Sequence, residues 1–266
     1  MKKLRYTILG CGSSGGVPRL GGHWGACDPA NPKNHRRRCS MLVELVDGEA
    51  VTRVLIDTSP DLRAQLLDAG VGHLDGVIYT HPHADHVHGI DDLRMIVFNR
   101  KSRLPVWADG PTSDALISRF GYAFVQPEGS PYPPILELNT ITAPTEISGA
   151  AGPISFAPFE VRHGSIDALG FRIGDLAYLP DVSHMTEPAW EAVRGLEVWV
   201  LDALRYAPHP THAHVAQSLE WIERAQPKRA VLTNMHIDID HTAIEAETPD
   251  HISAAYDGMT IELPAP

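Results

Sequence analysis

Short apolar, β-prone runs alternate along this chain with polar turns rich in glycine and proline. Such runs, bounded by turn residues, predict strands, and they fall at residues 3–9, 40–46, 53–57, 76–79, 104–108, 154–162, 169–173, 175–179, 198–201 and 229–232. Segments with helix start and stop signals predict helices at residues 61–69, 91–98, 112–120, 186–194 and 214–225. Turn residues predict hairpins at Asp47-Gly48, at Gly174 and, last, at Asp257-Gly258. No linker interrupts the pattern, so we expect one domain over residues 1–266, with two sheets flanked by helices.

The densest polar cluster follows the predicted strand at residues 76–79. It reads Thr80-His81-Pro82-His83-Ala84-Asp85-His86-Val87-His88-Gly89. His81 and His83 alternate, so they point the same way in extended backbone. Asp85 and His86 are adjacent and must diverge, unless a helix begins there, and divergence would suit two neighbouring cations. Imidazole and carboxylate are ligands for zinc, manganese or ferrous iron. So dense a cluster argues for a site rather than a solvated turn, with His88 outside it in a supporting or structural role.

This pattern, His-x-His-x-Asp-His, resembles the signature of the metallo-β-lactamase superfamily. The resemblance implies an α/β (α+β) fold, a four-layer αββα sandwich of two mixed sheets flanked by helices, with a metal centre at one edge. It also implies further ligands after later strands. His163 would complete one site with His81 and His83, Asp181 would bridge two metals, and a last His would complete the second site with Asp85 and His86.

The last ligand is the least defined. Related sequences often read Leu-Thr-His here, whereas this chain reads Leu232-Thr233-Asn234-Met235-His236. His236 is the preferred ligand, because asparagine is a poor ligand for a borderline-soft metal. Asn234 in the ligand position, with a weaker second site, stays open as the alternative, and His241 is a more distant one.

Further segments resemble the phosphodiesterase branch of the superfamily, which includes the phosphonate-pathway cyclic-phosphate phosphodiesterase and, more distantly, the tRNA 3′-end nucleases. They are Gly-Ser-Ser-Gly-Gly-Val-Pro at residues 12–18, Ile-Asp-Thr-Ser-Pro-Asp at 56–61, and Thr-His at 211–212 before a predicted helix. The resemblance implies that His212 is a general acid. His214 is its competitor, and helix capping is the structural alternative for both residues.

The glycine-rich loop after the first predicted strand formally contains Gly-x-Gly-x-x-Gly. A dinucleotide-binding turn must open a helix, and the following Val17-Pro18 segment cannot, so we expect this loop near the metal centre instead. The basic run Arg36-Arg37-Arg38 either meets a substrate phosphate or faces solvent. Relatives often hold this loop with a cysteine-bound zinc. Here only Cys27 lies inside it, and we expect no second zinc site. Asp57 either supports a histidine ligand or caps a turn.

Composition limits the functions that this chain can have. Its 266 residues are 43% hydrophobic and 21% charged, with a net charge of −11, which argues against broad nucleic-acid binding. A phosphate substrate remains compatible, since two cations make a site locally positive. No signal peptide or membrane-length apolar run is evident. The three cysteines favour a reducing cytoplasm over a disulfide scaffold. We therefore expect a small phosphate-containing substrate and no membrane or extended nucleic acid, and a homodimer stays open.

The predicted function is hydrolysis of a small phosphodiester, cyclic or nucleotide-like. Two divalent cations, Zn²⁺ or Mn²⁺, about 3.5 Å apart would share the attacking hydroxide. Asp85 would orient the second metal and the nucleophile, and His212 would protonate the leaving group. Two alternatives remain. One is thioester or β-lactam hydrolysis on the same metals. The other is a non-catalytic binder of a phosphate ligand, as relatives in pyrroloquinoline-quinone biosynthesis would be.

Overall fold

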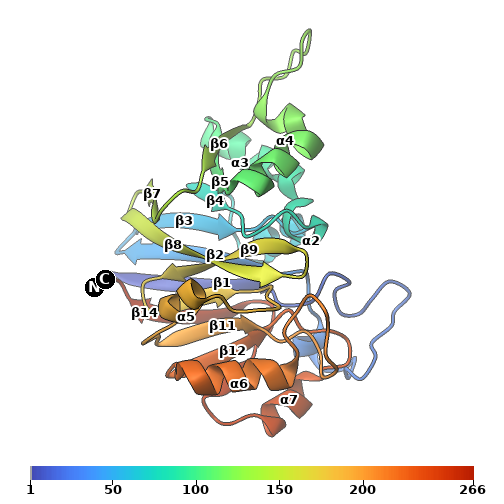
Figure 1. Ribbon diagram of the computed structural model, residues 1–266. Helices are drawn as coiled ribbons and strands as arrows, with labels where there is room; N and C mark the ends of the chain where they lie inside the picture. Colours follow the sequence, from blue (N-terminus) through green and yellow to red (C-terminus); the bar gives the residue numbers. More distant parts are fainter. Residues whose placement is uncertain (1) are drawn as a thin grey trace. The chain divides into compact units, whose positions relative to one another are not determined.

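The computed structural model describes residues 2–266, and this part of the chain forms two mixed sheets of seven strands each, with helices beside them (Figure 1). The packing divides the chain into two compact units. Unit 1 holds the N-terminal residues to Leu9, residues 40–155 and residues 260–266. Unit 2 holds residues 10–39 and 156–259. The expected class, two mixed sheets flanked by helices, is confirmed.

The first sheet has the order β14-β1-β2-β3-β4-β5-β6. Its strands are β14 (Met259–Pro264), β1 (Lys3–Gly10), β2 (Ser40–Asp47), β3 (Ala50–Ile56), β4 (Gly76–Ile78), β5 (Leu104–Ala108) and β6 (Leu136–Thr140). β2 and β3 form the hairpin predicted at Asp47-Gly48. β3, β4, β5 and β6 run parallel, so the carboxyl end of β4, where the histidine cluster starts, lies at a shared edge of the sheet.

The second sheet has the order β13-β12-β11-β10-β9-β8-β7. Its strands are β13 (Ile252–Ala254), β12 (Arg229–Thr233), β11 (Val198–Asp202), β10 (Leu176–Leu179), β9 (Ile166–Ile173), β8 (Gly152–His163) and β7 (Thr145–Gly149). The predicted hairpin across Gly174 is present as the antiparallel pair β9–β10. β10, β11, β12 and β13 run parallel, which brings the ends of successive strands to one edge.

Both units contain helices beside their strands. They are α1 (Leu62–Asp68), α2 (Ala84–Val87), α3 (Leu93–Arg100) and α4 (Gly110–Phe124) in unit 1, and α5 (Glu187–Ala192), α6 (Val215–Ala225) and α7 (His241–Glu247) in unit 2. Figure 1 shows α3 and α4 beside β5 and β6, and one apolar core joins helices and strands in unit 1. In unit 2, Trp190 of α5 and Trp221 of α6 meet edge to face, with ring centroids 6.2 Å apart. None of the helices within residues 2–266 is both long and apolar enough to span a membrane.

The last predicted hairpin is wrong, although its turn exists. Gly258 has a φ of 89°, and the Met259 amide donates to the Tyr256 carbonyl at 3.0 Å. The flanking strands, however, belong to different sheets, because β13 pairs with β12 and β14 lies next to β1. The short strands β6 and β7, and the helix α7, were not predicted. A turn depends on local residues, so the sequence predicts it. The pairing partner of a short strand depends on segments that are distant in the sequence.

The loop after β1 contains no helix before Pro32 within the described residues, which agrees with the rejection of a dinucleotide-binding turn. A buried guanidinium orders this loop. Arg36 is 2% exposed, and it donates to the side-chain oxygen of Asn34 at 3.1 Å and to the His236 carbonyl at 3.3 Å. Asn34 in turn donates to Asp240 at 2.6 Å. Arg36 therefore does not lie in a solvated basic turn, and its hydrogen bonds tie two distant loops together.

All three cysteines are buried free thiols. Cys27 donates to the carbonyls of Ile237 and Ile239 at 3.4 and 3.2 Å, so it fastens the same loop. Burial raises the pKa of the Cys27 thiol, and it raises the pKa values of Cys11 and Cys39 further. These side chains therefore act as small apolar groups with a weak S–H donor.

Candidate metal centre

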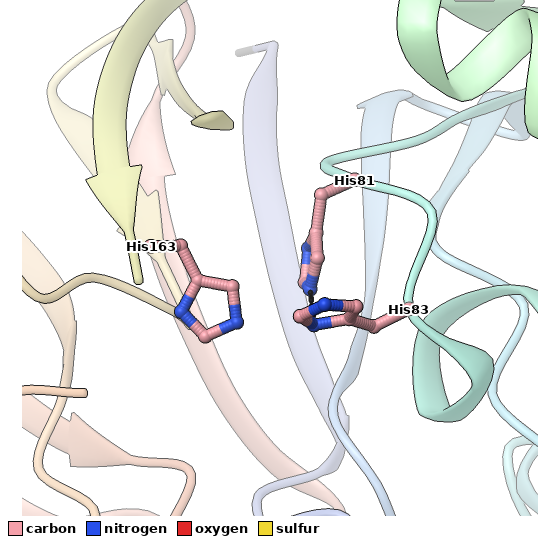
Figure 2. A group of neighbouring side chains, drawn as sticks. All are labelled: His81, His83 and His163. Atoms are coloured by element: carbon pink, nitrogen blue, oxygen red, sulfur yellow. Dashed lines mark hydrogen bonds between the residues drawn. The ribbon is translucent and has the colours of Figure 1, made fainter. Parts of the chain in front are cut away.

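The histidine cluster occupies the turn from β4 into α2. His83 lies in extended backbone as the N-cap of α2, which begins at Ala84. The His81 Nε2 atom lies 3.1 Å from the His83 Nδ1 atom, a contact that Figure 2 marks with a dashed line. Because a helix does begin here, Asp85 and His86 do not diverge, and the Asp85 carboxylate lies 3.7 Å from His86 Nε2. The sequence left these two cases open, and the helical one holds.

Hydrogen bonds behind the cluster fix which ring nitrogen carries the proton. The buried Asp57 carboxylate can only accept, so it accepts from the Thr80 hydroxyl at 2.8 Å and from His86 Nδ1 at 2.8 Å. With its only hydrogen committed to Asp57, the Thr80 hydroxyl must accept from His81 Nδ1, 2.9 Å away. Nδ1 therefore carries the proton in both His81 and His86, and Nε2 presents its lone pair, as metal-bound imidazole requires. Of the two roles predicted for Asp57, the hydrogen bond to His86 is the one found.

The segment after β3 also fixes the backbone of the cluster. The Thr58 amide donates to the His86 carbonyl at 2.8 Å, and the Gly89 amide donates to the Thr58 carbonyl at 2.9 Å. A Cβ at Gly89 would lie 2.0 Å from the Ser59 carbonyl oxygen, which is far inside van der Waals contact. The cluster thus ends in a glycine because only glycine permits this approach of two backbones.

In unit 2, His163 ends β8 and is also labelled in Figure 2. Its Nδ1 atom lies 2.6 Å from the Thr211 carbonyl oxygen. A carbonyl only accepts, so Nδ1 carries the proton and Nε2 is the nitrogen left for a metal. The segment that holds this ring is the one that carries His212, and the two rings meet with centroids 4.6 Å apart.

Three neighbouring parallel strands deliver polar side chains to one edge of the second sheet. Leu179 of β10 is level with Leu201 of β11, and Asp202 is level with Thr233 of β12. Asp181, Asp202 and Asn234 therefore follow one another across this edge. The Asn234 amide donates to Asp181 at 2.7 Å and to Asp202 at 3.1 Å. Within residues 2–266, Asp181, Asp202 and His212 form a group whose possible metal-donor atoms all lie within 4.8 Å of one another.

His212 forms a pair with Asp202. Its Nδ1 atom lies 3.0 Å from the Asp202 carboxylate, and the ring is partly exposed while Asp202 is fully buried. Burial raises the pKa of Asp202 to about 6, against the opposing effect of His212. Since Nδ1 donates to the carboxylate, Nε2 is the atom through which His212 can exchange a proton with a ligand. His214 differs, because it is the N-cap of α6 and its side chain makes no capping hydrogen bond.

The neighbours of His236 differ from the group formed by Asp181, Asp202 and His212. Its Nδ1 atom lies 2.8 Å from the Asp238 carboxylate, and its Nε2 atom contacts the guanidinium of Arg19 on the glycine-rich loop. Asn234, the alternative in the sequence, is the residue that reaches Asp181. His241 is buried beside Tyr256, with ring centroids 6.0 Å apart, and His88 packs edge to face with Phe120 at 5.5 Å.

A family model described as the beta-lactamase superfamily domain matches residues 52–237. The chain belongs to the metallo-β-lactamase superfamily. It is similar to a crystal structure described as a new diphosphatase from the PhnP family, with 34% identity, a TM-score of 0.86, and 99% of this chain and 98% of that chain covered. The two mixed sheets with their flanking helices are those of the metallo-β-lactamase fold, as the histidine signature predicted.

Two curated relatives of this metallo-β-lactamase superfamily chain carry different names. An octanoyltransferase of Porphyromonas gingivalis is 33% identical over 96% of this chain and 51% of its own length. A ribonuclease Z of Bradyrhizobium sp. (strain ORS 278) is 33% identical over 53% of this chain and 45% of its own length. The chain thus spans about half the length of the curated relatives that it matches.

The donor set of this superfamily member fits a divalent transition metal. Two nitrogens that bind one tetrahedral zinc ion at about 2.1 Å each lie about 3.4 Å apart, and His81 Nε2 and His83 Nδ1 are close to that spacing at 3.1 Å. The proton on Nδ1 of His81, His86 and His163 leaves Nε2 as the nitrogen that could bind a metal in each. Imidazole with carboxylate suits zinc, manganese or iron.

Sequence reasoning missed two residues that support this arrangement. Asp202 is a single acidic residue at the end of a buried strand, and nothing in its neighbourhood marks it. Its signal was the parallel alignment of β10, β11 and β12, with a polar residue at the end of each strand or within two residues of it. In the sequence Thr80 marks only the start of the cluster, and its role follows from the separate contacts of its hydroxyl with Asp57 and His81.

Proposed function

We propose that this chain is a metal-dependent phosphodiesterase that hydrolyses a small cyclic or nucleotide-like phosphodiester. The single observation that carries the proposal is the pair formed by His212 and the buried Asp202 beside Asp181. Hydrolysis of a phosphodiester with an alkoxide leaving group needs a proton donor. Hydrolysis of a thioester or β-lactam on the same metals gives this histidine no role.

The proposed ligands are the residues that the superfamily signature assigns. His81, His83 and His163 would hold one zinc or manganese ion, Asp85 and His86 a second, and Asp181 would be shared. Such ions supply a water molecule of lowered pKa and offset charge on the phosphoryl oxygens. The fixed Nδ1 protons of His81, His86 and His163 support the assignment.

The remaining steps belong to side chains of this chain. Asp85, in the first turn of α2, is partly exposed and would accept a hydrogen bond from the attacking water. His212 would give the proton on Nε2 to the departing oxygen. Asp202, which holds Nδ1, would keep the ring oriented and stabilise its charged form before that transfer.

The names of similar proteins support a substrate that is cleaved at a phosphoanhydride or phosphodiester bond. One similar structure is described as a diphosphatase and one curated relative as a ribonuclease. The name octanoyltransferase belongs to a protein of which this chain matches about half, so that name does not tell which half performs acyl transfer.

The test is the substitution His212→Ala, assayed on two phosphodiesters. On 2′,3′-cyclic AMP, whose leaving group is a ribose hydroxyl, the rate should fall roughly 10² to 10⁴-fold. On bis-p-nitrophenyl phosphate, whose leaving group needs little protonation, the loss should be much smaller. Metal content by elemental analysis should match that of the wild type.

The matched control is His214→Ala, two residues away at the start of α6, which should keep the rate on both substrates. A near-normal rate of His212→Ala on the cyclic substrate would remove His212 from the mechanism. Turnover of nitrocefin without turnover of either phosphodiester would favour the β-lactam alternative, and calorimetric binding of AMP without any turnover would favour a binding protein.

A further inference from the structure

The side chain of Ser183 holds the backbone on both sides of His163. Ser183 lies two residues beyond Asp181, in the segment that follows β10. Its hydroxyl donates to the Arg162 carbonyl at 3.0 Å and accepts from the Gly164 amide at 3.0 Å. These two partners are the residues directly before and after His163. The single hydrogen of the hydroxyl is therefore committed to the end of β8.

This contact joins two strands that are not neighbours in the sheet. β9 lies between β8 and β10, yet the segment after β10 reaches β8 and pairs with it. The Ser183 amide donates to the Arg162 carbonyl at 2.7 Å, and the Arg162 amide donates to the His184 carbonyl at 3.0 Å. Arg162 and His184 thus form an isolated antiparallel bridge. The end of β8 takes its position from this segment as well as from β9.

The same segment is connected to His212 through Asp202. The Val182 amide donates to the Asp202 carboxylate at 3.1 Å. The carboxylate also lies 3.0 Å from the Nδ1 atom of His212. A shift of Ser183 would therefore move its neighbour Val182, and with it a hydrogen bond of the carboxylate that orients His212.

A second connection joins His163 directly to the segment of His212. The His163 Nδ1 atom lies 2.6 Å from the Thr211 carbonyl oxygen, and His212 is the next residue. The approach is close, because a Cβ at Gly164 would lie 2.5 Å from the Thr211 Cγ2 atom. These contacts form a closed network within unit 2, whose members are His163, residues 211–212, Asp202, residues 182–183 and residues 162–164.

We propose that Ser183 is a positioning residue that sets the orientation of His163 and His212 together. The inference rests on the proposed phosphodiesterase function, in which His163 is a metal ligand and His212 is the proton donor. Without the hydroxyl, the backbone around His163 loses two hydrogen bonds. The displacement reaches His212 by two routes, through the Thr211 carbonyl and through the Val182 amide. Ser183 therefore acts on the reaction through these two histidines.

The test is Ser183→Ala, which removes the hydroxyl and little else. Zinc affinity, measured by competition with a chromogenic chelator, should fall roughly 10-fold, the low end of the usual effect of losing a contact behind a metal ligand. In zinc-saturated protein, the rate on 2′,3′-cyclic AMP should fall further than the rate on bis-p-nitrophenyl phosphate, because the first substrate depends more on the proton from His212. Ser183→Thr keeps the hydroxyl and should restore both quantities.

Thr186→Val is the matched control. The Thr186 hydroxyl has the same two kinds of partner, since it donates to the Glu160 carbonyl of β8 at 2.6 Å and accepts from the Ala189 amide at 3.2 Å. Thr186 lies outside the closed network. This variant should therefore keep the zinc affinity and the ratio of the two rates, even if it is less stable.

A second background separates positioning from a general loss of structure. In His212→Ala protein, Ser183→Ala should again lower the zinc affinity, but the rates on the two substrates should now fall by the same factor. The inference is overturned if Ser183→Ala keeps either the zinc affinity or the rate ratio of the wild type, or if Ser183→Thr restores neither. It is also overturned if Thr186→Val has the same effects, or if the ratio still changes without His212. Zinc affinity is measured without turnover, so failure of the proposed function, seen as no hydrolysis by the wild type, appears separately.

Discussion

A carboxylate that can only accept hydrogen bonds decides the proton positions of two histidines. Asp57 accepts from the Thr80 hydroxyl and from His86, and the hydroxyl then accepts from His81. One buried acid therefore orients two histidines whose Nε2 atoms carry lone pairs. Asp57 has a φ of 62°, a conformation that aspartate tolerates better than most residues. These hydrogen bonds explain why a threonine directly precedes the first histidine.

The substitution Thr80→Val tests this relay. Valine keeps the shape but loses the hydroxyl, so His81 loses the acceptor that holds its Nδ1 proton. Metal affinity should fall about 10- to 100-fold, the usual effect of removing a supporting hydrogen bond at a metal ligand. Competition with a chromogenic chelator measures the affinity of the purified protein for zinc.

Thr58→Val is the matched control for Thr80→Val. Thr58 is equally buried, but its hydroxyl contacts Tyr79 and the Val87 carbonyl rather than a histidine. Equal loss of metal affinity in the two variants would show a general effect of removing a buried hydroxyl, and the relay would have to be abandoned.

The sequence predicted the histidine cluster at this scale but not what supports it. His81, His83 and His86 stand close together in the chain, so their spacing alone indicates shared chemistry. Asp202 and His212 are ten residues apart across a proline-rich loop, and nothing local relates them. Their contact depends on how that loop folds back over the end of β11, which is a tertiary property.

At the scale of elements, two features position the polar side chains. One is the set of parallel strand ends, and the other is the close approach of two backbone segments. Parallel β10, β11 and β12 end level with one another, so Asp181, Asp202 and Asn234 need no long loops to meet. In unit 1 the segment after β3 crosses the backbone of the cluster at Gly89. Most strands were predictable from their apolar runs, but their order in the two sheets was not, because it depends on pairing between distant segments.

Gly89→Ala should disrupt this crossing. The added Cβ would lie 2.0 Å from the Ser59 carbonyl oxygen, so the two backbone segments must separate. Overpacking of this kind costs about 1–3 kcal/mol, and the displaced cluster should also bind metal more weakly. Urea unfolding of the metal-free protein measures the loss of stability.

Gly121→Ala serves as the control for Gly89→Ala. Gly121 lies in α4, and an added Cβ there meets no atom within 4 Å. Alanine is the better helix former by up to about 1 kcal/mol, so this variant should be as stable as the wild type or more so. A Gly89→Ala protein as stable as the wild type would show that the crossing can relax.

At the scale of the whole molecule, one buried acid links folding stability to pH. Asp257 accepts from the Cys11 and Arg37 amides at 3.2 and 2.8 Å. Burial raises the pKa of Asp257 to about 7. Its unfolded pKa is about 3.9, so between these values the folded state holds a proton that the unfolded state releases. The contribution of this group to stability is therefore present at low pH and is lost as pH rises toward 7.

Asp257→Asn removes this titration. The stability of the variant relative to the wild type should increase as pH rises from 5 to 7, by at most about 1.4 kcal/mol per pH unit. Denaturant unfolding at several pH values measures the difference. Asp175→Asn changes an aspartate whose side chain is 58% exposed and should show no such trend. A constant difference between Asp257→Asn and the wild type across this range would contradict the assignment.

The three buried thiols have a practical consequence. A thiol must be reached and deprotonated before it reacts with an alkylating reagent or an oxidant. Cys11, Cys27 and Cys39 are shielded, and their pKa values are raised. Labelling with iodoacetamide near neutral pH therefore selects molecules that have opened, and the cysteine that is labelled identifies which region of unit 2 opened first. The native chain thus contains its own reporters of local unfolding.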